Sequence, residues 1–206
     1  MKKIMFNDKY CLTQEVLAGR KTMTRRIEKP TEMAKGYTME DVVTIFHEYS
    51  SLLNAHSFSL YDNEKKIGVL NPRYQVGEVV AIAQCYKELY PYADFEMVGN
   101  GFMTESAGWN NKMFVRANLM KRHIRITDVK VERLQDISDD DIMREGVWQS
   151  YDQKNLFHVS KSIGYALDVV FLSARKAFTY LIDMVSGEGT WIFNPWVVAY
   201  SFELVD

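Results

Sequence analysis

The sequence predicts an α+β fold that is mainly β: a small β-barrel with peripheral helices and inserted segments. Strand-length apolar runs outnumber the few short helical patterns, and they do not alternate regularly with helices as in a Rossmann-like sheet. In one expected strand the apolar residues change parity, from Ile124 and Ile126 to Val129 and Val131. Such a change of face requires a bulge, which small barrels use to turn corners. The GxGxxG, GxxxxGK[ST] and GxSxG motifs are absent.

The composition is that of an ordinary globular domain. Hydrophobic residues make up 47% and charged residues 25% of the 206 residues, which is enough for one core. We therefore expect a single domain over residues 1–206. The net charge of -2 creates no overall field that attracts nucleic acid, so any such contact requires a local basic patch.

The sequence predicts no metal site, no cofactor and no membrane segment. Cys11 and Cys85 lie far apart without CxxC spacing, which is typical of reduced thiols in a reducing compartment, and the four histidines are scattered. No apolar run approaches the roughly 18 residues of a membrane helix. The apolar stretch at the N-terminus is too short for the core of a signal peptide, so we expect a cytoplasmic protein.

The N-terminal elements follow from periodicity. Residues 4–6 are expected to form a strand. Leu12 and Val16 then fall on one helical face, and Gly19 stands where a helix commonly ends in a left-handed residue. Residues 21–27 follow as an extended and strongly basic segment.

Residues 28–73 look like an insertion, because they contain too few apolar residues for a core of their own. Within them the apolar spacing over residues 42–53 predicts a helix. Residues 57–70 are expected to form a hairpin that turns near Asp62 and Asn63.

The remaining pattern is mostly strands. A buried strand is expected over residues 79–86 and a half-buried strand over 113–117. Ser138 and Asp141 are expected to cap the start of a short helix reciprocally, as in a capping box. Another helix should begin near Ser173 and end at Gly187, and the last strand begins at Trp196.

The segment Gly-Arg-Lys-Thr-Met-Thr-Arg-Arg at residues 19–26 follows an amphipathic helix and resembles the signature of the ASCH domain, a branch of the PUA-like barrels. Three further segments resemble that family in the same order: residues 74–80, 136–146 and 194–203. The last of these is similar to bacterial and phage members. The resemblance implies a PUA-like barrel with a cleft that holds RNA, a nucleoside or a nucleotide.

One bacterial branch of this family resembles an amidohydrolase that removes the acetyl group of N4-acetylcytidine with a lysine, a threonine and a glutamate. The resemblance implies catalytic roles for Lys21, Thr24 and Glu145, and Arg26 matches the family's arginine. Thr24 would supply a hydroxyl, and Lys21 a base or, if charged, a stabilising cation for the oxyanion. Glu145 would pass a proton to the leaving amine.

One feature departs from that branch. The chain is longer, and the extra residues fall mainly in 28–73 and 148–172, next to the signature segments. These insertions would cover the cleft, enlarge it or change its ligand. In addition, Lys21 and Thr24 are separated by an odd number of positions, so a regular strand points them to opposite faces. They share a pocket only if the chain bends between them.

Basic residues form the expected ligand-binding face. One group lies in the signature segment, and a second cluster spans residues 112–125 without an acidic residue between its cations. Together they would bind phosphates, although solvated surface charges explain the same pattern. The expected ligand-binding residues are Arg20, Arg25, Arg26, Lys112, Arg116 and Arg122.

Two functions from different classes remain. The first is an amidohydrolase acting on an acylated pyrimidine nucleoside such as N4-acetylcytidine. The alternative is a non-catalytic module that binds RNA or a nucleotide in the same basic cleft. The sequence makes no prediction of the oligomeric state.

Overall fold

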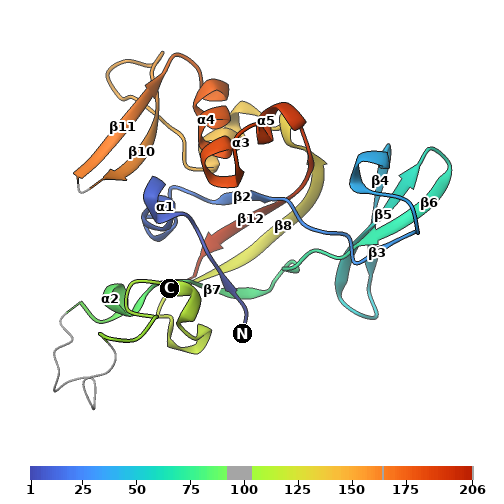
Figure 1. The fold of residues 1–206 in the computed structure, drawn as a ribbon, viewed down its shortest axis with the longest axis horizontal. Helices are drawn as coiled ribbons and strands as arrows, with labels where there is room; N and C mark the ends of the chain where they lie inside the picture. The colour runs from blue at the N-terminus through green and yellow to red at the C-terminus, as the bar shows by residue number, and fades with distance from the viewer. Residues whose placement is uncertain (92–103, 164, 206) are drawn as a thin grey trace.

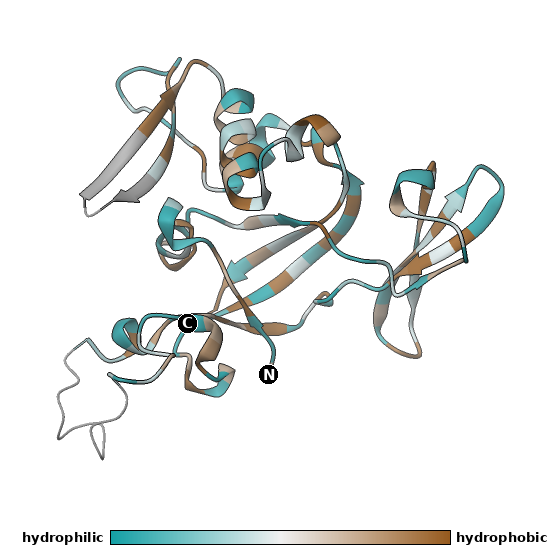
Figure 2. Cartoon of the chain, viewed as in Figure 1, coloured by the Kyte–Doolittle hydropathy of each residue, from teal (hydrophilic) through white to brown (hydrophobic). Residues whose placement is uncertain are grey.

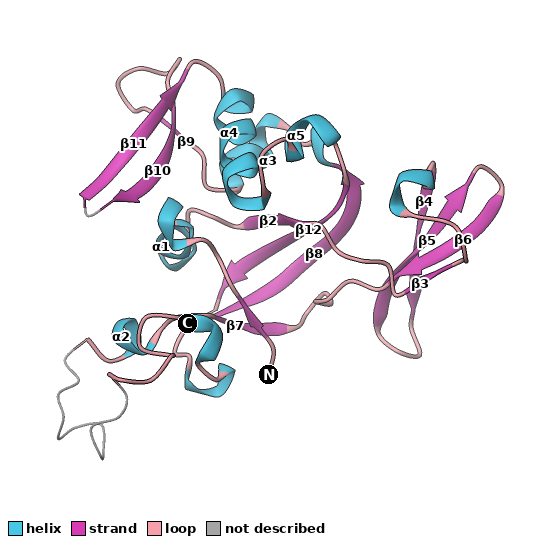
Figure 3. Ribbon diagram, in the orientation of Figure 1, coloured by secondary structure: helices cyan, strands magenta, loops and turns pink. Residues whose placement is uncertain are grey.

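The computed structural model describes residues 1–91, 104–163 and 165–205. The fold is mixed α+β and mainly β, with three sheets (Figure 1, Figure 3). The central sheet has five strands in the order β1-β7-β8-β12-β2. These strands span Lys3–Ile4 (β1), Val79–Ile82 (β7), His123–Arg133 (β8), Trp196–Leu204 (β12) and Met23–Arg26 (β2).

The central sheet is open within the described residues. β1 pairs with β7 and β2 pairs with β12, and no ladder joins β1 to β2. The chain just after β1 nevertheless approaches β2, because Arg26 Nη2 donates a hydrogen bond to the Met5 carbonyl at 2.7 Å. The α+β, mainly β class is thus confirmed, whereas the closed barrel is not.

The parity change in β8 has the predicted cause. Ser201 of β12 pairs with Asp128, but the next residue, Phe202, pairs with Ile126, so the register skips Thr127. Ile126 and Val129 are consequently both buried despite their odd separation. Hydrophobic and hydrophilic residues alternate along β8 on either side of this bulge (Figure 2).

The helices are short and surround the central sheet. α1 ends before Gly19, which has a φ of +72°, and Ser138 Oγ accepts the Asp141 N–H at the start of α3, both as predicted. The longest helix, α4, has 13 residues, and none in the described part of the chain has the length and hydrophobicity that crossing a bilayer demands. The helices span Leu12–Leu17 (α1), Tyr86–Leu89 (α2), Asp139–Arg144 (α3), Ala174–Ser186 (α4) and Thr190–Phe193 (α5), with 3-10 turns at Asp8–Tyr10, Met39–Asp41, Lys112–Phe114, Ala117–Leu119 and Leu134–Asp136.

Each predicted insertion contains a sheet. The first has the order β3-β6-β5-β4 and lies at one end of the molecule, away from the central sheet, and the second has the order β11-β10-β9 (Figure 1). The expected hairpin of the first insertion is confirmed, since β5 and β6 pair on either side of Asn63. These strands span Glu32–Met33 (β3), Thr44–Ser50 (β4), Ala55–Asp62 (β5), Lys65–Leu70 (β6), Trp148–Gln149 (β9), Phe157–Ile163 (β10) and Tyr165–Phe171 (β11).

The strand expected over residues 79–86 is confirmed only as far as Ile82, because α2 begins at Tyr86. Two other local predictions were wrong. The segment expected to form a helix over residues 42–53 is mostly the strand β4, which pairs along its whole length with β5. The partner strand decides the conformation there, because the short apolar pattern fits either structure. The strand expected over residues 113–117 is replaced by 3-10 turns that bury Val115 in a small satellite cluster with Ala81, Leu89 and Met120.

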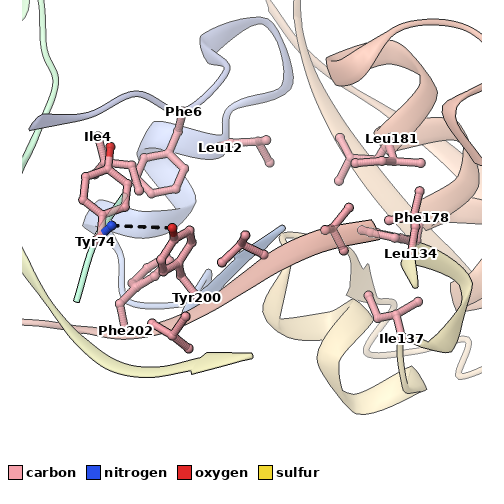
Figure 4. Packing of buried hydrophobic residues seen from close by; sticks show 14 of the residues in the cluster. Ile4, Phe6, Leu12, Tyr74, Leu134, Ile137, Phe178, Leu181, Tyr200 and Phe202 are labelled. Carbon is pink, nitrogen blue, oxygen red and sulfur yellow. Dashed lines mark hydrogen bonds between the residues drawn. The ribbon is translucent and has the colours of Figure 1, made fainter. Parts of the chain in front are cut away.

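The main hydrophobic cluster joins the central sheet to its surroundings. At one end Phe6 packs on Phe202, and Tyr74 contacts Tyr200 edge to face (Figure 4). At the other end Phe178 and its neighbours on α4 pack over residues that follow β8 (Figure 4). The same cluster includes residues of the first insertion, namely Val42, Phe58, Leu60, Ile67 and Leu70. The insertion is therefore tied to the core, and the single domain over residues 1–206 stays a prediction.

Candidate functional site

The segment that carries the ASCH-like signature is positioned by the end of α1. The backbone N–H groups of Arg20 and Lys21 both donate to the Glu15 carbonyl, at 2.9 and 3.0 Å. Gly19 allows this turn because its positive φ costs little without a side chain. The chain then enters β2, where Thr24 pairs with Tyr200 of β12.

Lys21 is buried and fully hydrogen-bonded. Only 2% of it is exposed, and its Nζ donates to the Met23 carbonyl (2.7 Å), the Glu145 carbonyl (2.6 Å) and Glu145 Oε2 (2.7 Å). Burial lowers the pKa of Lys21, and the nearby Arg26 and Arg25 add to this effect, while Glu145 opposes it. The fold thus brings together two of the expected catalytic residues, which lie 124 positions apart.

Arg25 extends this contact into a buried ion-pair network, made of Lys21, Arg25, Glu132, Asp141 and Glu145. The Arg25 side chain is completely buried; its Nη1 lies 3.1 Å from Glu145 Oε1 and its Nη2 lies 2.9 Å from Asp141 Oδ2. Arg25 Nε donates to Glu132 Oε1 at 2.8 Å. These carboxylates raise the pKa of Arg25 although burial opposes them. Removing one member would leave at least one buried charge with fewer partners, at a cost in stability.

Asp141 serves this network instead of the predicted capping box. Its N–H bonds to Ser138, but its carboxylate accepts from Arg25 and from Lys130 (3.0 Å) and pairs with Arg144 (3.2 Å). Burial opposes ionisation, and the hydrogen bonds from Lys130 and Arg25 outweigh it and hold the pKa of Asp141 below its usual value. The Asp141 carboxylate is therefore used for ion pairs with other elements and not for the reciprocal hydrogen bond of a capping box.

A pocket lies where the chain after β1 faces β2. We call it the edge pocket; its volume is about 330 Å³. Thr24 and Arg26 contribute to its wall from β2, and the C-terminal end of α4 closes one side with Val185. Because it occupies the gap between the two outer strands, the pocket is a consequence of the open sheet. Its wall consists of Met5, Phe6, Asn7, Leu12, Thr24, Arg25, Arg26, Ile27, Val185 and Ser186.

Arg26 is the notable polar group of this wall. Its guanidinium carbon lies 5.8 Å from the centre of the Phe6 ring, and its Nη2 bonds to the Met5 carbonyl. Its Nε is buried and has no hydrogen-bond partner among the described residues. A buried donor without a partner is costly, and it marks a position where a ligand acceptor would be stabilised.

Lys21 and Thr24 do not line this pocket together. Lys21 and Arg25 reach the same Glu145 carboxylate, whereas Thr24 and Arg26 line the edge pocket; Arg25, between them, pairs with Glu145 and also contributes to the pocket wall. Neither Lys21 nor Glu145 belongs to its wall. The Phe6 ring lies near both groups, with its centre 5.9 Å from Lys21 Nζ and 5.8 Å from the Arg26 guanidinium carbon. The edge pocket therefore holds Thr24 without Lys21.

A second pocket adjoins the first. We call it the neck pocket, because its residues flank the entry and exit of the first insertion; its volume is about 390 Å³. It shares Arg26 and Ile27 with the edge pocket, and Glu28, Lys29, Asn71 and Arg73 complete its wall. The sequence analysis did not single out these last four. The sequence does carry a signal for Glu28, because Thr24, Arg26 and Glu28 are spaced two residues apart and so point to the same side of one extended segment.

Glu28 connects this pocket to the core. Its Oε1 accepts the Tyr200 hydroxyl at 2.7 Å, and its Oε2 accepts the Arg73 N–H at 3.0 Å. Burial and the Glu28 carboxylate raise the pKa of Tyr200, so its hydroxyl stays protonated and donates. Both oxygens of Glu28 are therefore held by the protein.

The other expected basic residues lie elsewhere. Arg20 is exposed and pairs with Glu15 at 2.6 Å. Lys112 bonds to Asp8 Oδ1 (2.6 Å) and to the Phe6 carbonyl (2.6 Å), where it ties a 3-10 turn to the N-terminal segment. Arg116 lines a separate shallow pocket, and Arg122 is exposed next to β8. None of these four basic residues belongs to the wall of the edge pocket.

The described residues contain no group of three or more histidine, cysteine, aspartate or glutamate side chains placed to hold a metal ion. Comparisons with protein-family models, curated proteins and solved structures find no match to this chain.

Proposed function

We propose that the chain binds a nucleoside unit in the edge pocket, as a non-catalytic nucleoside- or nucleotide-binding module. The observation that carries the proposal is the buried, unpartnered Nε of Arg26, next to the Phe6 ring and Thr24 in the wall of one pocket. A guanidinium, an aromatic ring and a hydroxyl are the groups that recognise unstacked bases.

The three side chains have complementary tasks in this proposal. On ligand entry the Arg26 side chain turns so that its Nε, buried in the free protein, donates to a carbonyl oxygen of the base, which removes the cost of the unpaired donor. Thr24 supplies one hydroxyl donor and acceptor for the edge of the base. Phe6 and Val185 provide apolar surface for the base or the sugar. The resemblance to the ASCH domain points to the same ligand class, and we propose with it that the open central sheet is a variant of the PUA-like barrel.

Calorimetric titration with cytidine tests the proposal. We expect saturable binding by the wild-type chain and at least a tenfold loss of affinity in Arg26→Gln, because the neutral amide cannot replace the guanidinium. Arg20→Gln is the matched control; it alters a neighbouring exposed arginine outside the pocket and should leave the affinity unchanged. Absence of binding, or equal losses in both variants, would overturn the proposal.

Amide hydrolysis is the second candidate, favoured by the buried Lys21–Glu145 pair behind Phe6. The lowered pKa of Lys21 suits a base. Its three acceptors, however, hold its ammonium as a donor, and the pair faces away from Thr24. Hydrolysis therefore requires Phe6 to move so that Lys21 and Thr24 reach the same substrate.

Chromatography of N4-acetylcytidine incubated with the protein separates the two candidates. Hydrolysis consumes one water, breaks the amide C–N bond and yields acetate and cytidine. As a binding module the chain leaves the compound intact. Turnover that disappears in both Glu145→Gln and Thr24→Val would instead establish the enzyme.

A further inference from the structure

The side chains of the neck pocket carry more positive than negative charge. Arg26, Lys29 and Arg73 surround it, against the single carboxylate of Glu28. None of these three cations forms an ion pair with another described residue. Glu28 is held by the Tyr200 hydroxyl and the Arg73 N–H, so its oxygens face protein donors. The pocket therefore offers more positive than negative charge to an incoming group.

The cations are held in place by different means. The guanidinium of Arg73 lies over the Tyr74 ring, 5.7 Å from its centre, and the Arg73 carbonyl accepts a bond from Lys2 Nζ at 2.6 Å. Arg26 is fixed by the Met5 carbonyl and the Phe6 ring. Lys29 is exposed and lies three residues beyond the end of β2. Two guanidinium groups and one exposed ammonium suit a tetrahedral oxyanion.

The position of the neck pocket relates it to the nucleoside site. It shares Arg26 and Ile27 with the edge pocket, so a ligand that fills one reaches the wall of the other. Its other residues stand at both ends of the first insertion, where the entering and leaving chains are joined by bonds from Arg73 N–H to Glu28 and from Asn71 N–H to Thr31 Oγ1 (3.0 Å). The insertion thus supplies the residues that distinguish this pocket.

We infer that the neck pocket is a phosphate subsite, and that the ligand of the adjoining edge pocket is a nucleotide unit whose phosphate contacts Arg26, Lys29 and Arg73. This inference rests on the proposed nucleoside binding and narrows its ligand class. A free nucleotide and an RNA backbone share this chemistry. The first insertion then has a function, because it converts a nucleoside pocket into a nucleotide site.

Titrations with cytidine, cytidine 5′-monophosphate, the dinucleoside phosphate CpC and inorganic phosphate test the inference. We expect cytidine 5′-monophosphate to bind at least tenfold more tightly than cytidine. Arg73→Gln and Lys29→Gln should each reduce this advantage about three- to tenfold and leave cytidine affinity unchanged. Lys66→Gln is the matched control, because Lys66 lies on β6 of the same insertion, outside the pocket wall, and should have no effect. Tighter binding of CpC than of the monophosphate would identify RNA as the source of the phosphate, and the reverse a free nucleotide.

The outcomes separate this inference from the proposal on which it rests. Equal affinities for cytidine and its monophosphate would overturn the phosphate subsite and leave nucleoside binding intact. Inorganic phosphate binding that depends on Arg73, without any binding of cytidine, would support the subsite and overturn the nucleoside proposal. An affinity gain that is unchanged in Arg73→Gln and Lys29→Gln would also overturn the inference, since the phosphate would then bind elsewhere.

Discussion

The two sides of β2 differ in how completely their polar groups are paired. On one side Lys21 and Arg25 are buried against Glu145, and each donor of the Lys21 ammonium has an acceptor. On the other side Thr24 and Arg26 line the edge pocket, and Arg26 keeps a buried donor without a partner among the described residues. Residues adjacent in sequence thus enter very different environments.

This difference teaches that a basic signature segment has two separable tasks. The paired side joins β2 to α3 through the Arg25–Asp141 pair, and the Lys21–Glu145 pair adds a contact to the end of α3. Backbone bonds from Arg20 and Lys21 to the Glu15 carbonyl attach the end of α1. The unpaired side receives the ligand in our proposal. Substitutions on the paired side should therefore change stability, and substitutions on the unpaired side should change binding.

The largest expected effect is that of Lys21→Met. This change removes one of the two cationic partners of the buried Glu145 carboxylate and leaves its Oε2 without a donor, so we expect the free energy of unfolding to fall by about 3 kcal/mol. Urea denaturation followed by circular dichroism measures it. Arg20→Gln breaks the pair between an exposed guanidinium and the mostly buried Glu15 in the adjacent position and should cost about 1 kcal/mol. Similar small losses in both variants would show that the paired side does not hold the fold.

Two glycines test the packing around Lys21. Gly19 (φ +72°) and Gly146 (φ +106°) both have positive φ, but a Cβ on Gly146 would lie 2.9 Å from Leu12 Cδ2, while one on Gly19 meets nothing within 4 Å. We expect Gly146→Ala to lower the free energy of unfolding by about 2–3 kcal/mol, from backbone strain plus overpacking, and Gly19→Ala by about 1 kcal/mol, from strain alone. Thermal denaturation compares them. Equal losses would contradict the tight contact between α1 and the end of α3.

Two threonines sharpen the comparison, since they stand two residues apart. Thr24 lines the edge pocket, whereas Thr22 Oγ1 accepts a hydrogen bond from Arg144 Nε at 3.2 Å. We expect Thr24→Val to weaken cytidine binding about fivefold with little effect on stability. Thr22→Val should cost about 1 kcal/mol of stability and leave the affinity unchanged. The reverse pattern would place the ligand next to Thr22 and Arg144 and outside the edge pocket.

The smallest effect is the pH dependence that Asp141 contributes. Because its pKa in the folded protein lies below the ordinary 3.8, its ionised form stabilises the fold above pH 3.8, and this contribution is lost as the pH falls through the folded-state pKa. The stability gap between wild type and Asp141→Asn should therefore narrow on acidification below pH 4. Urea denaturation at several pH values measures it, and a gap that widens would contradict the assigned ion pairs.

Local chemistry explains what the sequence predicted well. The end of α1 at Gly19, the cap at Ser138 and the hairpin near Asn63 each depend on a few neighbouring residues. The bulge in β8 was visible as a change of parity. The resemblance to the ASCH domain was needed to connect Lys21 with Glu145, because the two residues lie in separate motifs far apart in the chain.

The features that the sequence did not predict depend on contacts between segments that lie far apart in the chain. β4 is a strand because β5 pairs with it. The Asp141 carboxylate does not complete the capping box, because it accepts hydrogen bonds from Arg25 and Lys130 instead. The edge pocket exists because the chain after β1 stops short of β2, so no local pattern marked Phe6 as part of a site. The neck pocket likewise joins the two ends of an insertion.

The most direct test of which side of β2 holds the ligand is an NMR titration with cytidine. If the edge pocket binds it, the backbone amide signals of Phe6, Thr24, Ile27 and Val185 shift together and saturate with one dissociation constant. The signals of Arg144 and Glu145, on the paired side, should move little. Shifts confined to Lys21 and Glu145, or to the exposed cluster around Arg116 and Arg122, would contradict the assignment.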